Sequence, residues 1–343
     1  MLNYDSIYDI ILINFNSLNL FLFIILTLIC AILIDITFGE LPVKIHPVVI
    51  IGHIINFFKN IFIKINNKIS GLLLVVFTSI ITLTIVALLI FFSTFNLIIY
   101  FIIFTILLSS TFSIKILLET AINVKNNLDE SLEKARESVS YLVSRNTQEL
   151  TESFIVSATI ESMTENITDS YVAPIFYYFI FGSLLLIFSN NNFIILLLLI
   201  SFFYRISNTL DAMVGYETDE LKIIGYIPAK LDDVLNYIPS RIAGIYIVIS
   251  SCLLKYNYKN SYKMFKRDAK NCPSPNSGFT MATTAGALDI QLIKKETYVL
   301  GDKNKEIDST DINKAVKLSK ITMFLFTITI IFLLTIIYVI SWK

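Results

Sequence analysis

Cysteine is scarce in this chain of 343 residues. Cys30, Cys252 and Cys272 form no C-x-x-C pair and are odd in number, so the sequence supports neither a disulfide framework nor a zinc site of paired cysteines. It also has no G-x-x-x-x-G-K-[ST] segment and no G-x-G-x-x-G unit after a strand, which argues against a P-loop or a Rossmann site. Net charge is zero, because 27 basic residues balance 27 acidic ones, and therefore predicts no nucleic-acid partner.

Apolar residues, in contrast, make up 55% of the chain. Stretches of about 18 or more apolar residues with few charges can cross a hydrocarbon core of about 30 Å. The clearest such stretches cover residues 18–36, 71–93, 95–118 and 321–342. The sequence thus predicts a polytopic membrane protein in contact with the lipid bilayer.

The middle of the chain decides the number of crossings. Two short apolar runs in 174–204 are split by Asn190, Asn191 and Asn192, which predicts a tight or re-entrant hairpin, and we expect 239–254 to be re-entrant or interfacial. Basic residues gather after the first and third spans and in 255–320, so the positive-inside rule places these loops in the cytoplasm. We predict an all-α polytopic bundle with about six crossings of the cell membrane. It would form one domain over 1–343, with helical cytoplasmic loops at 37–70, 119–173, 205–240 and 255–318.

Three carboxylates share one face of a predicted helix just before the apolar stretch that begins at Pro174. Glu161, Glu165 and Asp169 stand at i, i+4 and i+8, where like charges cost about 0.2–0.5 kcal/mol per pair. We therefore expect a cation to gather them. Mg²⁺ is commonly bound through one or two carboxylates and phosphate oxygens, so the pattern predicts a magnesium site that holds a phosphorylated substrate.

A second amphipathic helix is predicted just upstream. Apolar residues recur at helical spacing from Leu128 to Leu142, and Asn146 with Glu149 three residues later could cap the helix that carries the carboxylates. A helical hairpin would then bring Arg136 and Arg145 near Glu161. A solvated pair of charged helices explains the same pattern, and spacing alone does not separate the two interpretations.

Two further polar clusters lie beside predicted spans. Gly39, Pro42 and Pro47 break the chain after the first span and put Asp35, Glu40 and His46 on a loop at the membrane surface. A structural, hydrogen-bonded histidine is the alternative. After the run that ends at Tyr204 come Asn208, Asp211 and Tyr216. A carboxylate at that depth is costly unless it is paired, so Asp211 is a functional candidate. The alternative is a purely structural pairing of Asp211 with Arg205.

The last two polar clusters lie in the second half of the chain. Asp232, Asp233, Asn236 and Arg241 form one, in which Asp232 and Asn236 align at i, i+4; a cap or a surface ion pair would explain only one of the acids. In the other, Arg267 and Asp268 precede an S-P-N-S-G segment with Ser274, Asn276 and Gly278. Small residues with accessible backbone N–H groups after a basic cluster resemble a phosphate cradle, although the signal is weak alone.

Six of these segments, in this order, resemble the adenosylcobinamide-phosphate synthase family of cobalamin biosynthesis (CobD/CbiB). The matching segments are D-I-T-F-G-E-L-P-V-K-I-H-P-V-V-I-I-G from Asp35, A-R with R-N-T from Ala135 and Arg145, E-S-M-T-E-N-I-T-D-S-Y-V-A-P from Glu161, 208–216, 232–241, and 267–288 with S-P-N-S-G and A-G-A-L. The likeness covers most of the chain. It departs from the family at Met281, where an acidic residue is frequent, and at Ile293 and Lys294, where glycines are frequent.

The resemblance implies a membrane-bound ligase that joins adenosylcobyric acid to (R)-1-aminopropan-2-ol phosphate or a related amino-alcohol phosphate, with ATP consumed and Mg²⁺ present. It allows contact with other enzymes of the pathway and an active site on the cytoplasmic side. From residue chemistry we predict metal ligands at Glu161, Glu165, Asp169, Asp211, Asp35 and Glu40. Catalytic roles are predicted for His46, Asp233, Arg136 and Arg145, and substrate or phosphate binding for Asn166, Asn208, Tyr216, Asp232, Asn236, Arg241, Arg267, Asp268, Ser274, Asn276 and Gly278.

Two other functions fit parts of the pattern. A secondary transporter for a corrinoid or another anion would also carry intramembrane acids, but such sites usually lie near the midplane, whereas most acids here fall in predicted cytoplasmic loops. A membrane phosphotransferase of the CDP-alcohol type would need a D-x-x-D-G-x-x-A-R segment, which is missing around Arg136. The sequence therefore favours the ligase.

Overall fold

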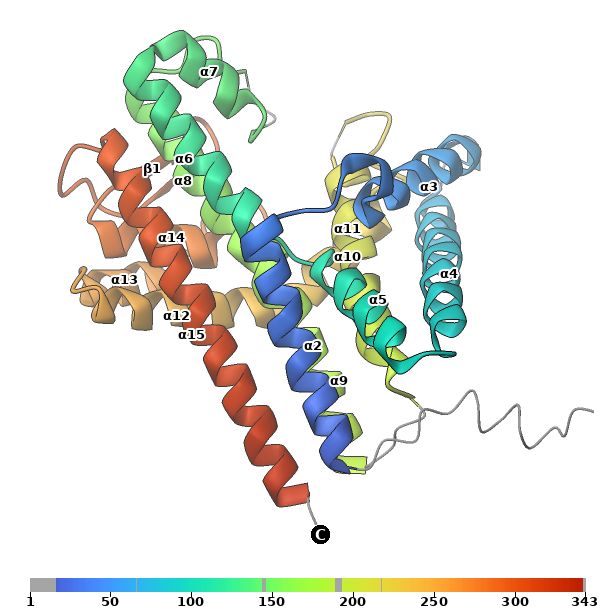
Figure 1. The fold of residues 1–343 in the computed structure, drawn as a ribbon. Helices are drawn as coiled ribbons and strands as arrows, with labels where there is room; N and C mark the ends of the chain where they lie inside the picture. Colours follow the sequence, from blue (N-terminus) through green and yellow to red (C-terminus); the bar gives the residue numbers. More distant parts are fainter. Residues whose placement is uncertain (1–16, 66, 144–145, 189–192, 217, 342–343) are drawn as a thin grey trace, which may run out of the picture. The chain divides into compact units, whose positions relative to one another are not determined.

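The computed structural model describes residues 17–65, 67–143, 146–188, 193–216 and 218–341. Over these ranges the chain is helical apart from one two-stranded sheet, and six helical stretches are long and apolar enough to cross a membrane (Figure 1). The predicted all-α polytopic membrane bundle is confirmed. The six candidate spans are α2 (Ser17–Phe38), α3 (Pro47–Phe62) with η2 (Ile63–Ile65), α4 (Lys68–Ser93), α8 (Glu152–Ile167) with η3 (Thr168–Val172) and α9 (Ala173–Phe188), α10 (Ile195–Val214), and α15 (Ser309–Ser341).

The chain forms two compact units. Unit 1 comprises Met1–Ser113, Pro174–Val234 and Thr329–Lys343, and unit 2 comprises Ile114–Ala173 and Leu235–Ile328. The second candidate span, α3 with η2, falls in the segment 37–70 that we expected to be a cytoplasmic loop. The single domain over 1–343 and the four loops stay predictions, as does the side of the membrane that each loop faces.

Unit 1 packs apolar helices against one another. In it α2 contacts α5 (Leu97–Ser109), and α3, α4 and α10 contact each other in pairs. Apolar side chains that point away from these contacts are exposed, as on Leu72 and Ile80 of α4, and a lipid-facing surface has this composition. Inside, the hydroxyls of Thr27 and Tyr178 share a hydrogen bond of 2.7 Å between α2 and α9. Such bonds satisfy polar groups where water is absent.

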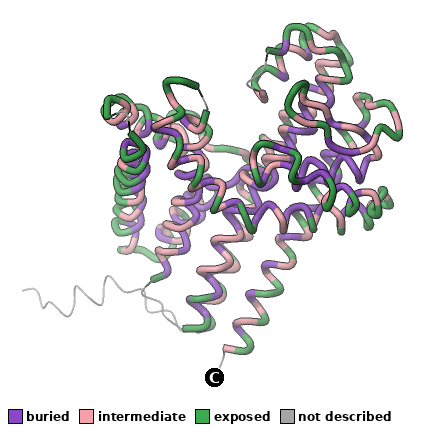
Figure 2. Tube along the Cα trace, turned by 180° about the vertical axis from the view of Figure 1, so that it is seen from behind, coloured by how far each residue is buried: buried purple, intermediate pink, exposed green. Residues whose placement is uncertain are grey.

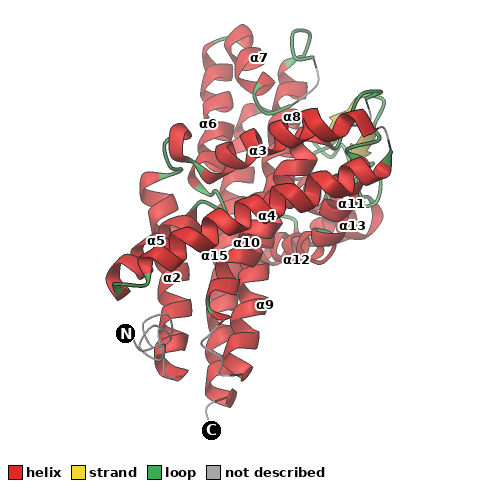
Figure 3. Ribbon diagram, turned by 90° about the vertical axis from the view of Figure 1, so that its right-hand side faces the viewer, coloured by secondary structure: helices red, strands yellow, loops and turns green. Residues whose placement is uncertain are grey.

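Unit 2 surrounds one short, fully buried helix. Every residue of α14 (Gly278–Leu288) is buried, and the helix contacts α8, α12 (Tyr237–Leu253) and α13 (Tyr258–Arg267) (Figure 2). Because α14 is rich in alanine, threonine and glycine, backbones approach closely; a Cβ on Gly286 would lie 2.6 Å from the carbonyl oxygen of Asn260. Strands β1 (Leu292–Lys294) and β2 (Tyr298–Leu300) follow as an antiparallel pair (Figure 3). This hairpin is the part of unit 2 that an all-α reading missed.

The predicted amphipathic helix at 128–142 is broken in two. The helix α6 (Lys115–Glu130) is followed by Ser131, whose hydroxyl accepts from Lys134 N at 3.2 Å and caps α7 (Leu132–Ser140). Its apolar face packs as expected, on a cluster that includes Val124, Ala135 and Ile155. Asn146 does not cap α8: its side chain accepts from Gln148 N, and α8 begins at Glu152.

Two other segments differ from expectation. The predicted span 95–118 is interrupted, because α5 ends at Ser109 and the hydroxyls of Ser109, Ser110 and Thr111 bond back to carbonyls three residues earlier. The two apolar runs of 174–204 belong to longer helical stretches. The first is continuous with α8 through η3, and the second belongs to α10, which extends to Val214. Residues Asn190–Asn192 and position 342 lie outside the described residues.

The helix that carries the carboxylates continues into the apolar span without a break. The π turn η3 joins α8 to α9 just before Pro174. Proline lacks an N–H and clashes with the carbonyl four residues earlier in a regular helix, and a wider turn relieves that conflict. Polar Glu161 and the apolar residues of α9 therefore belong to one helical stretch, Glu152–Phe188.

Candidate functional site

Glu161 is the most buried of the three carboxylates predicted to share one helix face, Glu161, Glu165 and Asp169, which we call the ladder. The residue is 4% exposed on α8. Its Oε1 accepts from the hydroxyl of Ser157 one turn earlier, and its Oε2 accepts from the hydroxyl of Tyr298 on β2 at 2.9 Å. Ser157 in turn accepts from the backbone N–H of Ile293 at 2.9 Å, which fastens β1 to α8. These donors offset part of the cost of burying a carboxylate and fix its direction.

A polar cavity of about 170 Å³ opens beside Glu161. Glu165 lines it one turn further along α8, as the i, i+4 spacing predicts, and Asn166, Lys294 and Tyr298 line it as well. Asp169 is not among the lining residues, because it lies in η3, where the wider turn interrupts the α-helical ladder. Among the described lining residues the positive group is Lys294 of β1; Arg136 does not line the cavity, and Arg145 lies outside the described residues. We call this space the Glu161 cavity.

The loop with S-P-N-S-G lies near the same carboxylates. Cys272 is buried; its thiol bonds to Ser277, and burial together with the charges of Glu165 and Glu161 raises its pKa to about 12. The Tyr298 hydroxyl also reaches the sulfur of Met281 on α14, at 3.7 Å, in addition to Glu161. The helix that follows the loop and the helix that carries the ladder thus meet at one tyrosine hydroxyl, within unit 2.

The sequence analysis did not identify Tyr298, but the surroundings of its hydroxyl explain why it acts as a hydrogen-bond donor to Glu161. Burial, and next the charge of Glu161, raise the pKa of Tyr298 well above its usual range. The hydroxyl therefore stays protonated at neutral pH and keeps donating to Glu161.

Arg241 holds the S-P-N-S-G loop in place. Its guanidinium lies 3.5 Å from the ring centre of Tyr237 and 4.2 Å from that of Phe279. It donates to Asn276 Oδ1 at 2.9 Å and to the carbonyl of Pro275 at 3.3 Å. Within the loop, Ser274 Oγ accepts from the N–H groups of residues 276 and 277. Arg241 and Asn276 therefore shape this loop, and their predicted contact with phosphate stays a prediction.

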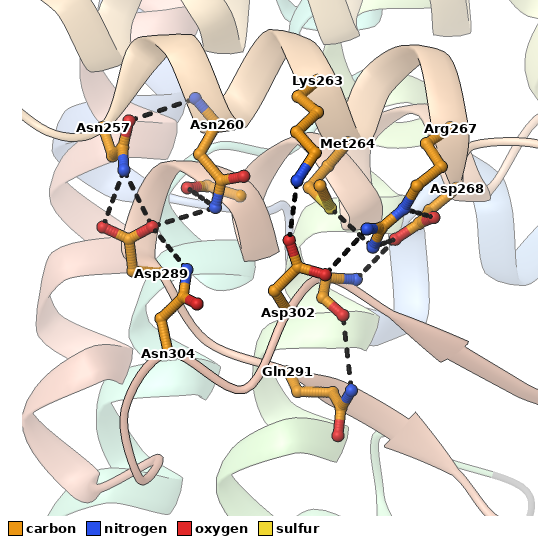
Figure 4. A network of polar contacts seen from close by, with 12 residues as sticks. Asn257, Asn260, Lys263, Met264, Arg267, Asp268, Asp289, Gln291, Asp302 and Asn304 are labelled. Carbon is orange, nitrogen blue, oxygen red and sulfur yellow. Dashed lines mark hydrogen bonds and ion pairs between the residues drawn. The ribbon is translucent and has the colours of Figure 1, made fainter.

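Arg267 and Asp268 belong to a second polar network (Figure 4). Arg267 donates to both oxygens of Asp268, at 2.6 and 2.7 Å, and to Asp302 at 2.7 Å. Buried Asp268 also accepts from Gly301 N at 2.8 Å, and Gly301 has a φ of +85°, a conformation that glycine adopts most easily. The network ties the end of α13 to the loop after β2. All three nitrogens of Arg267 thus donate within the protein.

The same figure shows Asp289 in a cage of amides. This residue ends α14 with a φ of +55° and accepts from Asn257 at 2.9 and 3.0 Å, from Asn260 at 2.9 Å and from Asn304 at 3.2 Å. Asn257 also caps α13 by accepting from Asn260 N at 3.1 Å. The amides fix the turn between α14 and β1 and so support the strand that carries Lys294.

Other predicted residues of unit 2 serve the backbone. Arg136 donates from Nε to the carbonyl of Leu150 at 3.0 Å, and Arg145 lies outside the described residues. Asn166 donates to Ser162 O at 2.8 Å while lining the Glu161 cavity. Asn236 is buried at the start of α12, and Gly278 is close-packed, since a Cβ there would lie 2.2 Å from Ala269 O.

Unit 1 contains its own cluster of predicted residues around His46. The Nδ1 atom of His46 accepts from Val48 N at 3.2 Å and so caps α3, and its Nε2 lies 3.9 Å from Glu40. Burial lowers the pKa of His46, consistent with the neutral ring that an accepting Nδ1 requires. Asp35 is buried near the end of α2.

The remaining predicted residues of unit 1 lie on α10 and α11 (Tyr226–Leu235) or just after α10. Arg205, the alternative partner of Asp211, donates to Asn208 at 3.3 Å. Asp211 folds back on its own helix end, where a Cβ on residue 215 would meet its Oδ1 at 2.1 Å. Asp233 accepts from Lys230 Nζ at 2.9 Å. Asp232 is buried, and Tyr216 is exposed.

The Glu161 cavity fits a magnesium ion that is shared with a substrate. Among the described residues, no three His, Cys, Asp or Glu side chains group closely enough to hold a metal by themselves. Mg²⁺ usually needs only one or two carboxylates, with water and phosphate oxygens completing its shell, and Glu161 and Glu165 supply that number. The bonds from Ser157 and Tyr298 are the kind that orient a metal-binding carboxylate. Asp35, Glu40 and Asp211 belong to unit 1, and their part in a metal site stays a prediction.

Of the residues that the sequence reasoning missed, Ser157 carried a signal. It precedes Glu161 by four residues, the spacing at which a hydroxyl reaches a carboxylate on one helix face. Lys294 and Met281 were noted only as departures from a family pattern. Tyr298 carried no signal, because it is 137 residues from Glu161 in sequence and reaches it only through the packing of the β1–β2 hairpin on α8.

Comparison with known proteins gives consistent matches over most of the chain. The family described as CobD/Cbib protein matches residues 28–319. A probable cobalamin biosynthesis protein CobD of Methanothermobacter thermautotrophicus is 43% identical over 301 residues, 88% of this chain and 95% of that protein. A protein of the same description from Methanococcus maripaludis is 40% identical over 80% of this chain and 88% of its own, and a cobalamin biosynthesis protein CobD of Leptospira interrogans is 36% identical over 55% and 59%. No solved structure matches the chain.

Proposed function

Because the chain belongs to the CobD/Cbib protein family, we propose that it works in cobalamin biosynthesis as a membrane-bound ligase. The reaction joins adenosylcobyric acid to (R)-1-aminopropan-2-ol phosphate, or a related amino-alcohol phosphate, with ATP as co-substrate. The active site faces the cytoplasm, and other enzymes of the pathway are candidate partners.

One observation carries this proposal beyond the family. The Tyr298 hydroxyl contacts both Glu161 on α8 and Met281 on α14, so the carboxylate ladder and the helix after the S-P-N-S-G loop meet within unit 2. Two segments that the sequence keeps more than a hundred residues apart therefore both contact Tyr298, which lines the Glu161 cavity. A ligase that handles phosphorylated substrates needs such a site, where acidic and basic groups stand together.

The residues of the cavity suit the chemistry of amide formation. A carboxylate is a poor electrophile, so ATP must first activate it, most simply as an acyl phosphate. Glu161 and Glu165 would hold Mg²⁺, which when bound offsets the negative charge of phosphoryl oxygens. Lys294 offsets the charge of the two carboxylates before substrate arrives, and Tyr298 keeps Glu161 oriented.

The test is a direct assay of the purified, full-length protein. We expect ATP, Mg²⁺, adenosylcobyric acid and aminopropanol phosphate to give the amide, detected by mass spectrometry. Glu165→Gln should lower the rate by about a hundredfold or more while the protein stays folded, because it removes a charge from the cavity without changing its size. The control is Glu133→Gln, which changes an exposed carboxylate of α7 and should keep the wild-type rate.

Two results would overturn the proposal. Full activity in Glu165→Gln would remove this residue from the site. Absence of the amide, with ATP-independent uptake of a corrinoid into sealed vesicles, would favour the secondary transporter.

A further inference from the structure

Unit 2 has a second cavity, of about 260 Å³, at the beginning of α8. Its polar lining comes from Ser153 and Ser157 of α8, from Gln291 before β1, and from Lys303, Lys305 and Glu306 of the loop before α15; Phe154 lines it as well. We call this space the Lys303 cavity. Its volume suits a small group, because pockets for larger organic ligands measure about 300–1,000 Å³.

The lysines of this cavity are held by ion pairs that differ in strength. Lys303 pairs with Glu306 at 2.8 Å, but their side chains are 61% and 81% exposed, and such exposed pairs contribute about 0–1 kcal/mol. Lys305 instead contacts Asp311, whose side chain is fully buried. An incoming anion can therefore replace Glu306 as the partner of Lys303 at little cost, while Lys305 stays paired with Asp311.

Two further features at the cavity favour an anion. Phe154, which lines the space, has the Lys295 ammonium 4.8 Å from its ring centre, which adds a third positive charge nearby. Thr151, at the N-cap position of α8, makes no side-chain capping bond, so the first turn of a 16-residue helix begins at the cavity without that partner. Helix starts favour negative charge, and here this effect adds to the lysines that carry the argument.

We propose that the Lys303 cavity binds the phosphate group of a small phosphorylated ligand. Lysine ammonium groups, a serine hydroxyl and the start of a helix are the donors that phosphate binding uses. The inference rests on the proposed function only for the two ligands it names, a nucleoside triphosphate and the amino-alcohol phosphate. The S-P-N-S-G loop is a poorer candidate, because Ser274 already accepts from two of its N–H groups.

The position of the cavity connects it to the carboxylates. Ser157 lines the Lys303 cavity and donates to Glu161, which lines the other cavity. Successive residues of β1 separate in the same way, since Ile293 lines the Lys303 cavity and Lys294 the Glu161 cavity. A phosphate in the first cavity is thus one side chain away from the carboxylate of the second.

The test measures binding by titration calorimetry on the full-length protein in detergent micelles, without a corrinoid and without turnover. ATP, aminopropanol phosphate and inorganic phosphate are titrated separately to distinguish the sources of the phosphate group. We expect Lys303→Gln to weaken binding of at least one of them about tenfold, as for the loss of one charged hydrogen bond, and Lys303→Glu to weaken it further.

Lys134→Gln is the matched control. Lys134 pairs with Glu130 on the surface of unit 2, with side chains 61% and 59% exposed, much like Lys303 and Glu306, but it lines neither cavity. Unchanged binding in Lys303→Glu, equal loss in Lys134→Gln, or no binding of any of the three compounds by the wild type would each overturn the proposal. Phosphate binding without amide formation would leave this inference standing and remove only the proposed ligase.

Discussion

Two polar regions of unit 2 use similar residues in opposite ways. In the network around Arg267, all three guanidinium nitrogens donate to Asp268, Asp302 or a sulfur, and Asp268 in turn accepts from Gly301 N. In the Glu161 cavity, a buried carboxylate is oriented by two hydroxyls but borders open space together with Glu165 and Lys294. Charged residues saturated by the protein stabilise the fold, whereas those at a cavity are available to a ligand. Substitutions in the two regions should therefore separate stability from activity.

The largest effect on stability is expected in the network. Arg267→Ala leaves Asp268, whose side chain is 5% exposed, without its bidentate partner, which should lower the free energy of unfolding by about 3–5 kcal/mol. Lys263→Ala, which removes an exposed partner of Asp302, should cost less than about 1 kcal/mol. Thermal denaturation in detergent measures both. Wild-type stability with lost activity in Arg267→Ala would instead place Arg267 at the substrate.

A smaller effect, on stability and on activity, is expected at Ser157, which holds the Glu161 carboxylate in place. Ser157→Ala removes the donor to Glu161 and the acceptor of Ile293 N, and should cost about 1–3 kcal/mol because buried polar groups lose partners. The amide-forming rate should fall as well. Ser138→Ala on α7 removes a hydroxyl that bonds only to its own helix, and serves as the control. Equal stability of the two variants would contradict the role of Ser157.

Tyr298→Phe should affect activity more than stability. The variant keeps the ring and loses the hydroxyl that orients Glu161, so we expect a rate about tenfold lower, with unfolding free energy changed by about 1 kcal/mol. Tyr262→Phe, on an exposed tyrosine of α13, should match the wild type. An unchanged rate with a large loss of stability would show that Tyr298 stabilises the fold and does not act in the reaction.

The smallest effect concerns His46 in unit 1, whose ring caps a helix. Since burial lowers the folded-state pKa of His46 below 6.5, the unfolded chain binds the proton more readily, and stability should fall as pH decreases from 6.5 through the lowered pKa. His46→Asn keeps a capping acceptor and should flatten this dependence, while His46→Ala should cost about 1 kcal/mol at pH 7.5. Loss of amide formation in a stable His46→Asn protein would support a catalytic role instead.

Local patterns predicted much of this molecule. The apolar stretches 18–36, 71–93 and 321–342 correspond to the candidate spans α2, α4 and α15, although α3 was not expected to span, and the i, i+4 spacing put Glu161 and Glu165 at one cavity. Interruptions within helices were harder to predict from the sequence. The end of α5 at Ser109 and the turn η3 depend on hydroxyls and on a proline inside otherwise apolar sequence.

The site was predicted less completely than the fold. Of the two arginines expected near the carboxylates, Arg136 does not line the cavity and Arg145 lies outside the described residues. Lys294 does line it, because β1 packs against α8. Arg241 and Arg267 look like phosphate ligands by residue type. Their actual partners, Asn276 and Asp302, lie about 35 positions away in sequence and follow from packing that no local pattern encodes.

The sheet of three-residue strands has a consequence for how this site tolerates change. Leu292, Ile293 and Lys294 pair in order with Leu300, Val299 and Tyr298. Slipping one strand by a single residue would turn each side chain to the opposite face. An insertion in the tight turn at 295–297 that shifted β1 by one residue would thus put an ammonium in place of an aliphatic group in the Lys303 cavity and an aliphatic group in place of an ammonium in the Glu161 cavity. The length of that turn sets the charge of each cavity as firmly as the identity of any residue lining it.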